Sequence, residues 1–379
     1  MKIEPVPVVQ GKKASGAAGA ERFWNRKTAA LVPYMPGEQP RDRVFIKLNT
    51  NENPYGPAPE VRQALSTFAA GQLRLYPDPA SSALRRAIAD YTGLTADQIF
   101  VGNGSDEVLA LAFQAFFEPL RQSPADAAQA VTFPDITYSF YPVYARFYEL
   151  NWRTIPLAAD FSLPVDRFLL PSGGIVLANP NAPTGLAVGI DVIEQLATAD
   201  RNRLVIVDEA YVDFGAETAV PLLSDFDNLL IIQTCSKSRA LAGIRLGYAL
   251  GAPALIDALQ RVRDSFNSYT LDRLAQSVGE AAFGAAAWFE ETRDRIIRSR
   301  ERLAAALAER SFQVLPSSAN FVFARHGRVS GQQLYRGLRD QGILVRHFDL
   351  PRISDFVRIT VGTDRQIDEL IRALDRLLV

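Results

Sequence analysis

Residues 203–251 read RLVIVDEAYVDFGAETAVPLLSDFDNLLIIQTCSKSRALAGIRLGYALG. Three short apolar runs lie in this stretch, at 204–207, 229–232 and 246–250. They contain Val, Ile and Leu with little polar alternation, which is typical of strands that are buried on both faces of a mostly parallel sheet. Polar residues follow the first two runs and precede the third. We therefore expect three strands of a buried sheet with polar side chains near one edge.

Short apolar runs of this kind occur over most of the chain. From about residue 61, segments with helical periodicity alternate with further apolar runs at 99–101, 130–133 and 174–178. This alternation predicts an α/β domain whose mostly parallel sheet is covered by helices. Long helical segments follow from about residue 253, and strand and helix patterns after residue 320 predict a smaller α/β lobe. The expected parts are an N-terminal arm and loop layer at 1–45, a large α/β domain at 46–275 and a small C-terminal domain at 276–379.

Composition excludes several classes of function. The 379 residues include 41 Lys and Arg against 42 Asp and Glu, so a formal charge of −1 gives no attraction to nucleic acid. A single cysteine, Cys235, forms no internal disulfide and no multi-cysteine metal site. Two histidines, His326 and His347, are too few for a histidine-rich metal site and lie in no nucleophile spacing. We expect no bound metal.

The chain also lacks signals for a membrane. It has no window of 18 or more apolar residues, and its first 13 residues, MKIEPVPVVQGKK, contain Glu4 and two prolines where a signal peptide would be apolar. These features predict a cytoplasmic protein without membrane association, whose thiol is reduced.

Lysine usage singles out one position. Of the six lysines, Lys237 is the one that lies after residue 47, where arginine supplies nearly every other positive charge. A lone lysine can occur at this position by chance. It can also occur because a site there needs a primary amine that is able to lose its proton.

Several polar residues are expected beside Lys237 because ligands collect at the carboxyl ends of parallel strands. The turn Gly102-Asn103-Gly104-Ser105 leads into a helix, so Ser105 and Asp106 either cap that helix or bind an anion through its N-terminus. Asp208 ends an apolar strand and needs a cationic partner, either in a structural ion pair or on a cofactor. An amine, a carboxylate for a ring nitrogen, Tyr211 for a phenolic oxygen and an anion pocket together indicate pyridoxal phosphate. Thr234, Ser236 and Arg245 would form that pocket.

These motifs make the chain recognisable. It resembles the fold-type I aminotransferases, which use pyridoxal phosphate, and within them the histidinol-phosphate aminotransferase subgroup. The resemblance runs from about residue 33 to the end. It rests on LNTNENPYGPAP (48–59), YPDP (76–79), GNGSDE (102–107), ITYSFYPVYA (136–145), NPNAPTG (179–185), VDEAYVDF (207–214), TCSKSRALAGIRLGYALG (234–251), NFVFAR (320–325) and VRITVG (357–362).

The resemblance implies a role for each cofactor-binding position. Lys237 would bond to the cofactor and carry the substrate proton, and Asp208 would pair with the ring nitrogen. Tyr211 and Asn181 would hold the ring oxygen, and Tyr138 would stack on the ring. The phosphate would be held by Ser105, Asp106, Thr234, Ser236 and Arg245.

It also implies substrate-binding residues and a partner. Arg358 is similar to the arginine that binds the α-carboxylate of the substrate, and Asn51 is expected near the same group. Arg346 and Tyr34 are similar to the groups that bind a substrate phosphate. Tyr76 is similar to a tyrosine that reaches the site of a second subunit, which implies a homodimer with shared active sites. The expected substrates are small molecules, and the expected reaction converts L-histidinol phosphate and 2-oxoglutarate to imidazole acetol phosphate and L-glutamate in histidine biosynthesis.

Two points stay open. Ala182 stands where many relatives have a second asparagine before the proline, so the role of Asn181 is in question. The same fold also serves aromatic amino-acid aminotransferases and threonine-phosphate decarboxylases, and a non-catalytic binding protein would retain it as well.

Overall fold

A computed structural model describes residues 21–34, 37–40, 43–119 and 129–378. Its larger sheet has seven strands in the order β2-β8-β7-β6-β5-β3-β4, and β8 alone runs antiparallel to its neighbours. The predicted α/β class with a mostly parallel sheet is confirmed. The strands are β2 (Ile99–Asn103), β3 (Val131–Pro134), β4 (Trp152–Ile155), β5 (Gly174–Ala178), β6 (Val205–Asp208), β7 (Leu229–Thr234) and β8 (Leu246–Gly251).

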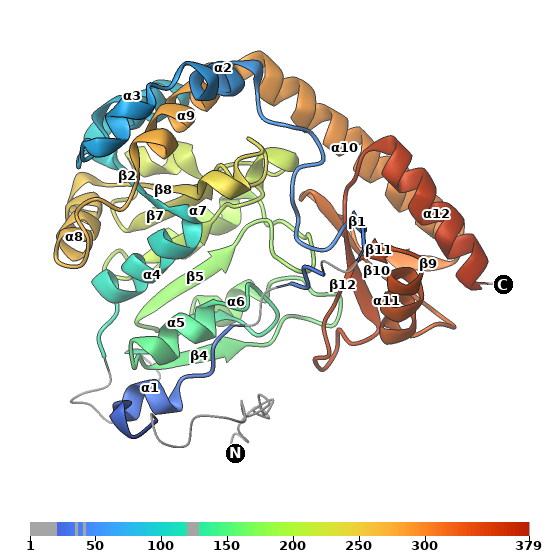
Figure 1. Cartoon of the computed structure of the whole chain (residues 1–379). Coiled ribbons are helices and arrows are strands. Elements are labelled where there is room, and N and C mark those ends of the chain that lie inside the picture. Colours follow the sequence, from blue (N-terminus) through green and yellow to red (C-terminus); the bar gives the residue numbers. More distant parts are fainter. Residues whose placement is uncertain (1–20, 35–36, 41–42, 120–128, 379) are drawn as a thin grey trace.

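Helices cover both faces of this sheet (Figure 1). Alternate residues of β6 explain why, because Ile206 packs into one hydrophobic core and Val205 and Val207 into the other. All three side chains are fully buried, as the unbroken apolar run requires. One face holds α4 (Gly104–Phe116), α5 (Tyr141–Phe147) and α8 (Pro253–Asp264), and the other holds α2 (Pro59–Thr67), α3 (Ser82–Thr92), α7 (Ile190–Ala199) and α9 (Arg273–Gly284).

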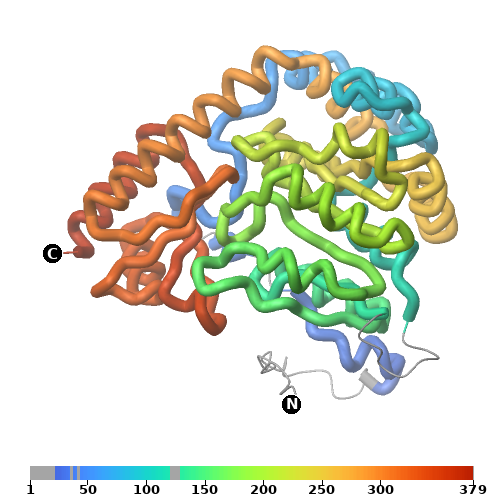
Figure 2. The backbone as a smooth tube through the Cα atoms, turned by 180° about the vertical axis from the view of Figure 1, so that it is seen from behind, coloured from blue at the N-terminus to red at the C-terminus, as the bar shows by residue number. Residues whose placement is uncertain are grey.

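The C-terminal part forms a second, smaller lobe. A four-stranded antiparallel sheet, in the order β12-β13-β10-β9, lies beside the two-stranded parallel pair of β1 and β11. The long helix α10 extends from the large lobe to the small lobe, as the view from behind shows (Figure 2). The elements are β1 (Ile46–Lys47), α10 (Ala286–Ala308), β9 (Phe312–Val314), β10 (Phe321–His326), α11 (Gly331–Asp340), β11 (Ile343–Leu344), β12 (Arg346–His347), β13 (Phe356–Thr360) and α12 (Asp364–Leu378), with short helices α1 (Arg26–Ala30) and α6 (Val165–Phe168) elsewhere.

Among the helices that the structure describes, none is long and apolar enough to cross a membrane. The longest, α10, has 23 residues, and its sequence is rich in Arg and Glu.

Three details differ from the sequence pattern. The continuous run ILVRHF at 343–348 has the pattern of one strand but divides at Val345, since β11 pairs with β1 and β12 with β13. Strands β4 and β9 gave no apolar run because they lie at sheet edges, where part of each strand faces solvent.

The hydrophobic cores that residues join also bear on the expected limit between the two domains. The expected limit between residues 275 and 276 falls inside α9, whose buried residues Ala275, Val278 and Ala282 belong to the core of the large sheet. Leu48, just after β1, packs instead in the core of the small lobe. The packing favours a limit near Ala285, with residues 46–51 attached to the small lobe.

Two glycines allow the turn between β2 and α4 to approach β8. Gly104 has φ +81°, and a Cβ there would lie 2.5 Å from the Arg245 Nη2 atom. A Cβ on Gly247 would lie 2.2 Å from the backbone nitrogen of Ser105, closer than atoms can approach. The close packing of these segments therefore depends on the absence of side chains.

Gly247→Ala should lower the free energy of unfolding by about 1–3 kcal/mol, because the new methyl group meets backbone rather than a movable side chain. Urea unfolding followed by circular dichroism measures this change. Gly243→Ala is the matched control, since a Cβ there meets no atom within 4 Å. Equal stability of the two variants would contradict the packing argument.

Candidate active site

A cavity of about 290 Å³ lies where β6 and β7 end and β8 begins. Because β8 is antiparallel to β7, Arg245 at its amino end lies at the same edge as Asp208 and Lys237. The cavity therefore gathers most of the predicted cofactor-binding residues. Those that line it are Ser105, Asp106, Tyr138, Asp208, Tyr211, Thr234, Ser236, Lys237 and Arg245.

Asp208 is the last residue of β6, and its residue surface is 5% exposed. Its Oδ1 accepts a hydrogen bond from the Ala210 backbone N–H at 3.1 Å, and its Oδ2 accepts one from the Tyr141 hydroxyl at 3.0 Å. Burial raises the pKa of Asp208 to about 6, although both hydrogen bonds act in the opposite direction. The carboxyl group is thus ready to lose or gain its proton in response to a neighbouring charge.

Lys237 lies just beyond β7, and its amine is directed toward the N-terminal segment of the chain. The Nζ atom donates a hydrogen bond to the Thr50 carbonyl oxygen at 3.3 Å and lies 5.8 Å from the centre of the Tyr211 ring. Asn53 Nδ2 donates to the carbonyl oxygens of Lys237 and Ser238, at 3.0 and 3.1 Å. Residues of this segment therefore fix the backbone that carries the amine.

The other end of the cavity is suited to an anion. Helix α4 begins at Gly104 with Asn103 as its N-cap, so Ser105 and Asp106 are not capping residues but lie in the first turn. Their backbone N–H groups lie at the positive end of the helix dipole. Arg245 Nη2 lies 3.2 Å from Asp106 Oδ2, and this half-exposed pair leaves the guanidinium available to a ligand.

Hydroxyl groups complete the anion-binding end. Thr234 Oγ1 donates to Ser236 Oγ at 3.0 Å and accepts a hydrogen bond from the Ser236 backbone N–H at 3.1 Å. Both residues are buried. Two hydroxyls, a guanidinium and a helix N-terminus are the groups that proteins use to bind phosphate.

Two tyrosines border the middle of the cavity. The Tyr138 hydroxyl donates to Asp106 Oδ1 at 2.6 Å, which holds its ring against the cavity. The Tyr211 hydroxyl oxygen accepts a hydrogen bond from Asn51 Nδ2 at 2.8 Å. Since that oxygen is already an acceptor, its own proton is free to be donated into the cavity.

The predicted substrate-binding residues lie on the side of the small lobe. Arg358 Nη2 donates to the Asn49 carbonyl oxygen at 3.0 Å, whereas its buried Nε has no hydrogen-bond partner among the described residues. Burial lowers the pKa of Arg358, and the nearby charge of Arg346 adds to this effect. A part-buried guanidinium whose Nε donor is unpaired favours an anionic ligand.

The remaining substrate-side residues lie around Arg358. Arg346 is its register partner between β12 and β13, and both guanidinium groups lie over the ring of Phe348. The Tyr34 ring lies 4.2 Å from that of Phe140. Asn51 is buried and connects Tyr211 to Thr360 of β13 through its amide.

The structure does not bring Asn181 into the cavity. Its Nδ2 donates to the Ile136 carbonyl oxygen and to Thr184 Oγ1, both at 3.0 Å, and its side chain lines a separate small cavity. Ala182 lines the larger cavity instead. With its amide hydrogens bound elsewhere, Asn181 is not placed to donate to a ring oxygen, and Tyr211 is the better placed donor.

Tyr76 also lies away from the cavity of its own chain. Its surface is 75% exposed, and its ring stacks on that of Tyr269 with 4.6 Å between centres. Arg273 holds the local backbone through hydrogen bonds to the carbonyl oxygens of Leu75 and Tyr76. That Tyr76 reaches the active site of a second subunit remains a prediction.

Sequence reasoning missed Tyr141 and the lining residues Gln39, Thr50 and Glu52. Tyr141 is the first residue of α5, three residues after Tyr138, and no local pattern marks its side chain as part of the site. Glu52 is paired with Lys47 at 2.7 Å, which accounts for one of the few lysines.

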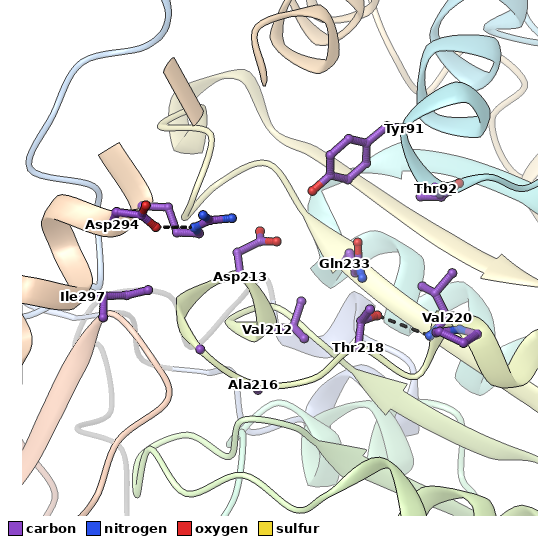
Figure 3. Close-up of a pocket in the computed structure, with 13 residues that line it drawn as sticks. Tyr91, Thr92, Val212, Asp213, Ala216, Thr218, Val220, Gln233, Asp294 and Ile297 are labelled. Atoms are coloured by element: carbon purple, nitrogen blue, oxygen red, sulfur yellow. Dashed lines mark hydrogen bonds and ion pairs between the residues drawn. The ribbon is translucent and has the colours of Figure 1, made fainter. Parts of the chain in front are cut away.

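A second cavity, of about 610 Å³, lies between α3, α10 and the loop after β6 (Figure 3). The described residues that line it include none of those predicted for the site. Two of its polar side chains have partners within the protein: Asp213 accepts a hydrogen bond from Ser238, and Gln233 donates to Glu209.

Comparison with known proteins shows the family of this chain. Residues 43–374 match the family described as aminotransferase class I and II. The chain belongs to this family. It is 54% identical over 357 residues to histidinol-phosphate aminotransferase 1 of Bradyrhizobium diazoefficiens, with 94% of this chain and 99% of that protein covered. The corresponding enzyme of Clostridium acetobutylicum is 49% identical over 350 residues, with 92% and 97% covered.

Solved structures agree with the family. The histidinol-phosphate aminotransferase of Sinorhizobium meliloti, determined in complex with pyridoxal-5'-phosphate, superposes with a TM-score of 0.83 at 25% identity and covers 95% of this chain and 98% of that one. The prediction of an aminotransferase with the fold-type I architecture is confirmed.

The buried Asp208 should make the unliganded protein less stable as the pH rises. Its pKa is about 6 when folded and 3.8 in the unfolded reference, so the folded state binds the proton more tightly. Stability is therefore lost between these two pH values as the pH increases, by up to about 3 kcal/mol. Asp208→Asn should remove this loss. The free energy of unfolding of the variant should therefore exceed that of the wild type by a larger amount at pH 8 than at pH 5.

Urea unfolding of the cofactor-free protein at the two pH values measures the difference. Asp257→Asn, at an exposed position on α8, is the control and should follow the wild type. Parallel pH profiles for Asp208→Asn and the wild type would show that burial of Asp208 costs nothing.

Proposed function

We propose that this protein is a pyridoxal-phosphate-dependent transaminase that moves an amino group between L-histidinol phosphate and 2-oxoglutarate. The products are imidazole acetol phosphate and L-glutamate. One observation carries the proposal: the Lys237 amine, the buried Asp208 carboxyl and the anion-binding end with Arg245 share one cavity. The identity of 49–54% to proteins named histidinol-phosphate aminotransferase, over more than nine tenths of the chain, supports the choice of substrate.

The residues present fit pyridoxal phosphate. Ser105, Thr234, Ser236 and Arg245 supply hydroxyls, N–H groups and a cation for a phosphate at one end. Asp208 supplies a carboxylate for a ring nitrogen in the interior. When bound, the cofactor provides an electron sink for a carbanion at the substrate α-carbon.

Lys237 has two tasks in this scheme. Its primary amine would bond to the cofactor, and the same amine would accept the proton from the substrate α-carbon. Arginine could perform neither task because its guanidinium does not lose its proton in proteins. This requirement accounts for an isolated lysine in an arginine-rich chain.

The small lobe supplies the anion-binding groups for the two substrates. Arg358, with its unpaired Nε, binds a carboxylate in a bidentate manner, and Asn51 lies beside it through its contact with Tyr211. Arg346 and Tyr34 meet the phosphate of histidinol phosphate or the second carboxylate of 2-oxoglutarate. Two arginines can serve both substrates because 2-oxoglutarate carries two carboxylates, and histidinol phosphate carries a doubly charged phosphate in place of an α-carboxylate.

A homodimer with shared active sites is part of the proposal. Tyr76 is exposed together with Leu73, Leu75, Phe266 and Tyr269, although large apolar side chains usually avoid water. These residues lie in or beside the segment that carries Tyr76, whose ring already stacks on Tyr269. Burial against a second subunit would cover them and bring Tyr76 to the partner's cavity.

Purified enzyme supplied with pyridoxal phosphate and 2-oxoglutarate should turn over L-histidinol phosphate with a kcat/KM at least about 100-fold above that for phenylalanine or tyrosine. In this donor a doubly charged phosphate replaces the α-carboxylate, and it can engage Arg346 as well as Arg358. Glutamate formation measures the reaction. Arg346→Gln should reduce kcat/KM for histidinol phosphate by about 10- to 100-fold and have a smaller effect on tyrosine. Equal rates for all donors would contradict the assignment.

Phosphothreonine is a useful additional donor. Release of carbon dioxide without glutamate formation would indicate a decarboxylase of the same fold. Absence of any spectral change with glutamate would indicate a non-catalytic binding protein.

Shared active sites predict complementation between inactive subunits. Lys237→Ala should abolish turnover, and Tyr76→Ala should weaken it strongly. After denaturation and refolding of an equal mixture, about a quarter of the sites would combine an intact Lys237 with an intact Tyr76 from the other subunit. Activity should therefore rise toward a quarter of the wild-type value, and an activity that stays at the mean of the two variants would show that each subunit works alone.

A further inference from the structure

Tyr141 is a buried phenol beside the candidate active site. It is the first residue of α5 and is 0% exposed. Its hydroxyl donates to Asp208 Oδ2 at 3.0 Å, and no other hydrogen bond of this hydroxyl occurs in the described part of the chain. The rings of Phe113, Phe133 and Tyr138 pack around it, with centres 5.7–6.2 Å away. Water is thus excluded from the contact.

The groups facing Asp208 come from four elements. The Tyr141 hydroxyl and the Ala210 N–H each donate to one carboxylate oxygen and favour the ionised form. The positive charge of Lys237 acts in the same direction, and the negative charge of Asp106 opposes it. Tyr141 is therefore the one side chain among these that hydrogen-bonds Asp208 directly.

Tyr141 remains a donor at every pH that the protein meets. Burial, together with the adjacent Asp208 carboxylate, raises the pKa of Tyr141 well above its ordinary value. Without its hydroxyl, Asp208 Oδ2 would face aromatic rings without a partner, which is costly for a carboxylate and tolerable for the protonated acid.

We propose that Tyr141 is a positioning residue that keeps Asp208 ionised and oriented toward a protonated ring nitrogen of the cofactor. The inference rests on the proposed function in taking pyridoxal phosphate as the cofactor, but it does not depend on the amino donor. A protonated Asp208 could not pair with a ring nitrogen that also carries a proton. Tyr141 thereby sets the lower pH limit of productive cofactor binding.

Tyr141→Phe should raise the pH at which cofactor affinity declines by about one unit, since one pKa unit corresponds to a tenfold change. The dissociation constant of pyridoxal phosphate from the cofactor-free protein, measured by fluorescence titration, should rise about fivefold at pH 6 and less than about 1.5-fold at pH 8.5. The defect shrinks at high pH because Asp208 ionises there even without Tyr141.

Tyr248→Phe is the matched control. Tyr248 is 4% exposed, and its hydroxyl donates to Gln233 Oε1, an amide rather than a carboxylate. Loss of this hydroxyl should lower stability and leave the ratio of the affinities at pH 6 and pH 8.5 unchanged.

A spectroscopic measurement separates positioning from packing. With ¹⁵N-labelled pyridoxal phosphate, the ring nitrogen of Tyr141→Phe should shift at pH 6 toward the value of an unprotonated pyridine, whereas wild type and Tyr248→Phe keep the protonated value. An equal loss of affinity at both pH values with an unchanged nitrogen signal would overturn the proposal.

A second variant covers the case in which Tyr141→Phe does not fold. Site-specific replacement of Tyr141 by 3,5-difluorotyrosine retains the ring and the hydroxyl but makes it a stronger donor, so the decline in affinity should move to lower pH. No movement would overturn the proposal. These measurements use no amino donor, so a failure to turn over histidinol phosphate would be distinguishable from a failure of the role of Tyr141.

Discussion

The position of Asp208 at the end of a strand buried on both faces is the constraint on which the site depends. A carboxyl group there is removed from water and stabilised by two hydrogen bonds, from Ala210 and Tyr141. Burial makes its ionised form costly, and a cationic ligand lowers that cost. A buried carboxyl group that opposes folding at neutral pH is a feature common at functional sites.

Around Asp208 the polar groups are distributed by the topology of the sheet. Parallel strands β6 and β7 end at one edge, and the reversed strand β8 begins there, so a carboxyl, an amine and a guanidinium come from three successive strands. The small lobe adds Arg358 and, through Thr360, holds Asn51 against Tyr211. Residues 48–53 are hydrogen-bonded to both lobes and join the two halves of the site.

Much of this arrangement could be predicted from sequence. Apolar runs that end in Asp208 and Thr234 mark buried parallel strands, and such strands place their following residues at one edge. The direction of β8 was not predictable, because a run buried on both faces has the same composition whichever way it runs. Arg245 was nevertheless assigned to the correct edge.

Other residues depend on geometry that no local pattern carries. Tyr141 reaches Asp208 because of how α5 lies across the sheet, over a separation of 67 residues. Between the neighbours Asn181 and Ala182, the backbone of the turn decides that Ala182 faces the cavity. The family resemblance named the right loop but not the side chain that points inward.

The reversal of β8 has a consequence for how this chain can vary. A parallel strand is reached by a crossover that runs from the carboxyl edge of the sheet to its opposite edge, so the crossover can change in length away from the carboxyl edge. The connection from β7 to β8 never leaves the edge, and it carries both Lys237 and Arg245 within residues 235–245. An insertion between these two residues would alter the distance between the amine and the anion-binding end directly. Length changes are therefore tolerable in the longer connection from β6 to β7, at 215–228, and excluded in this short one.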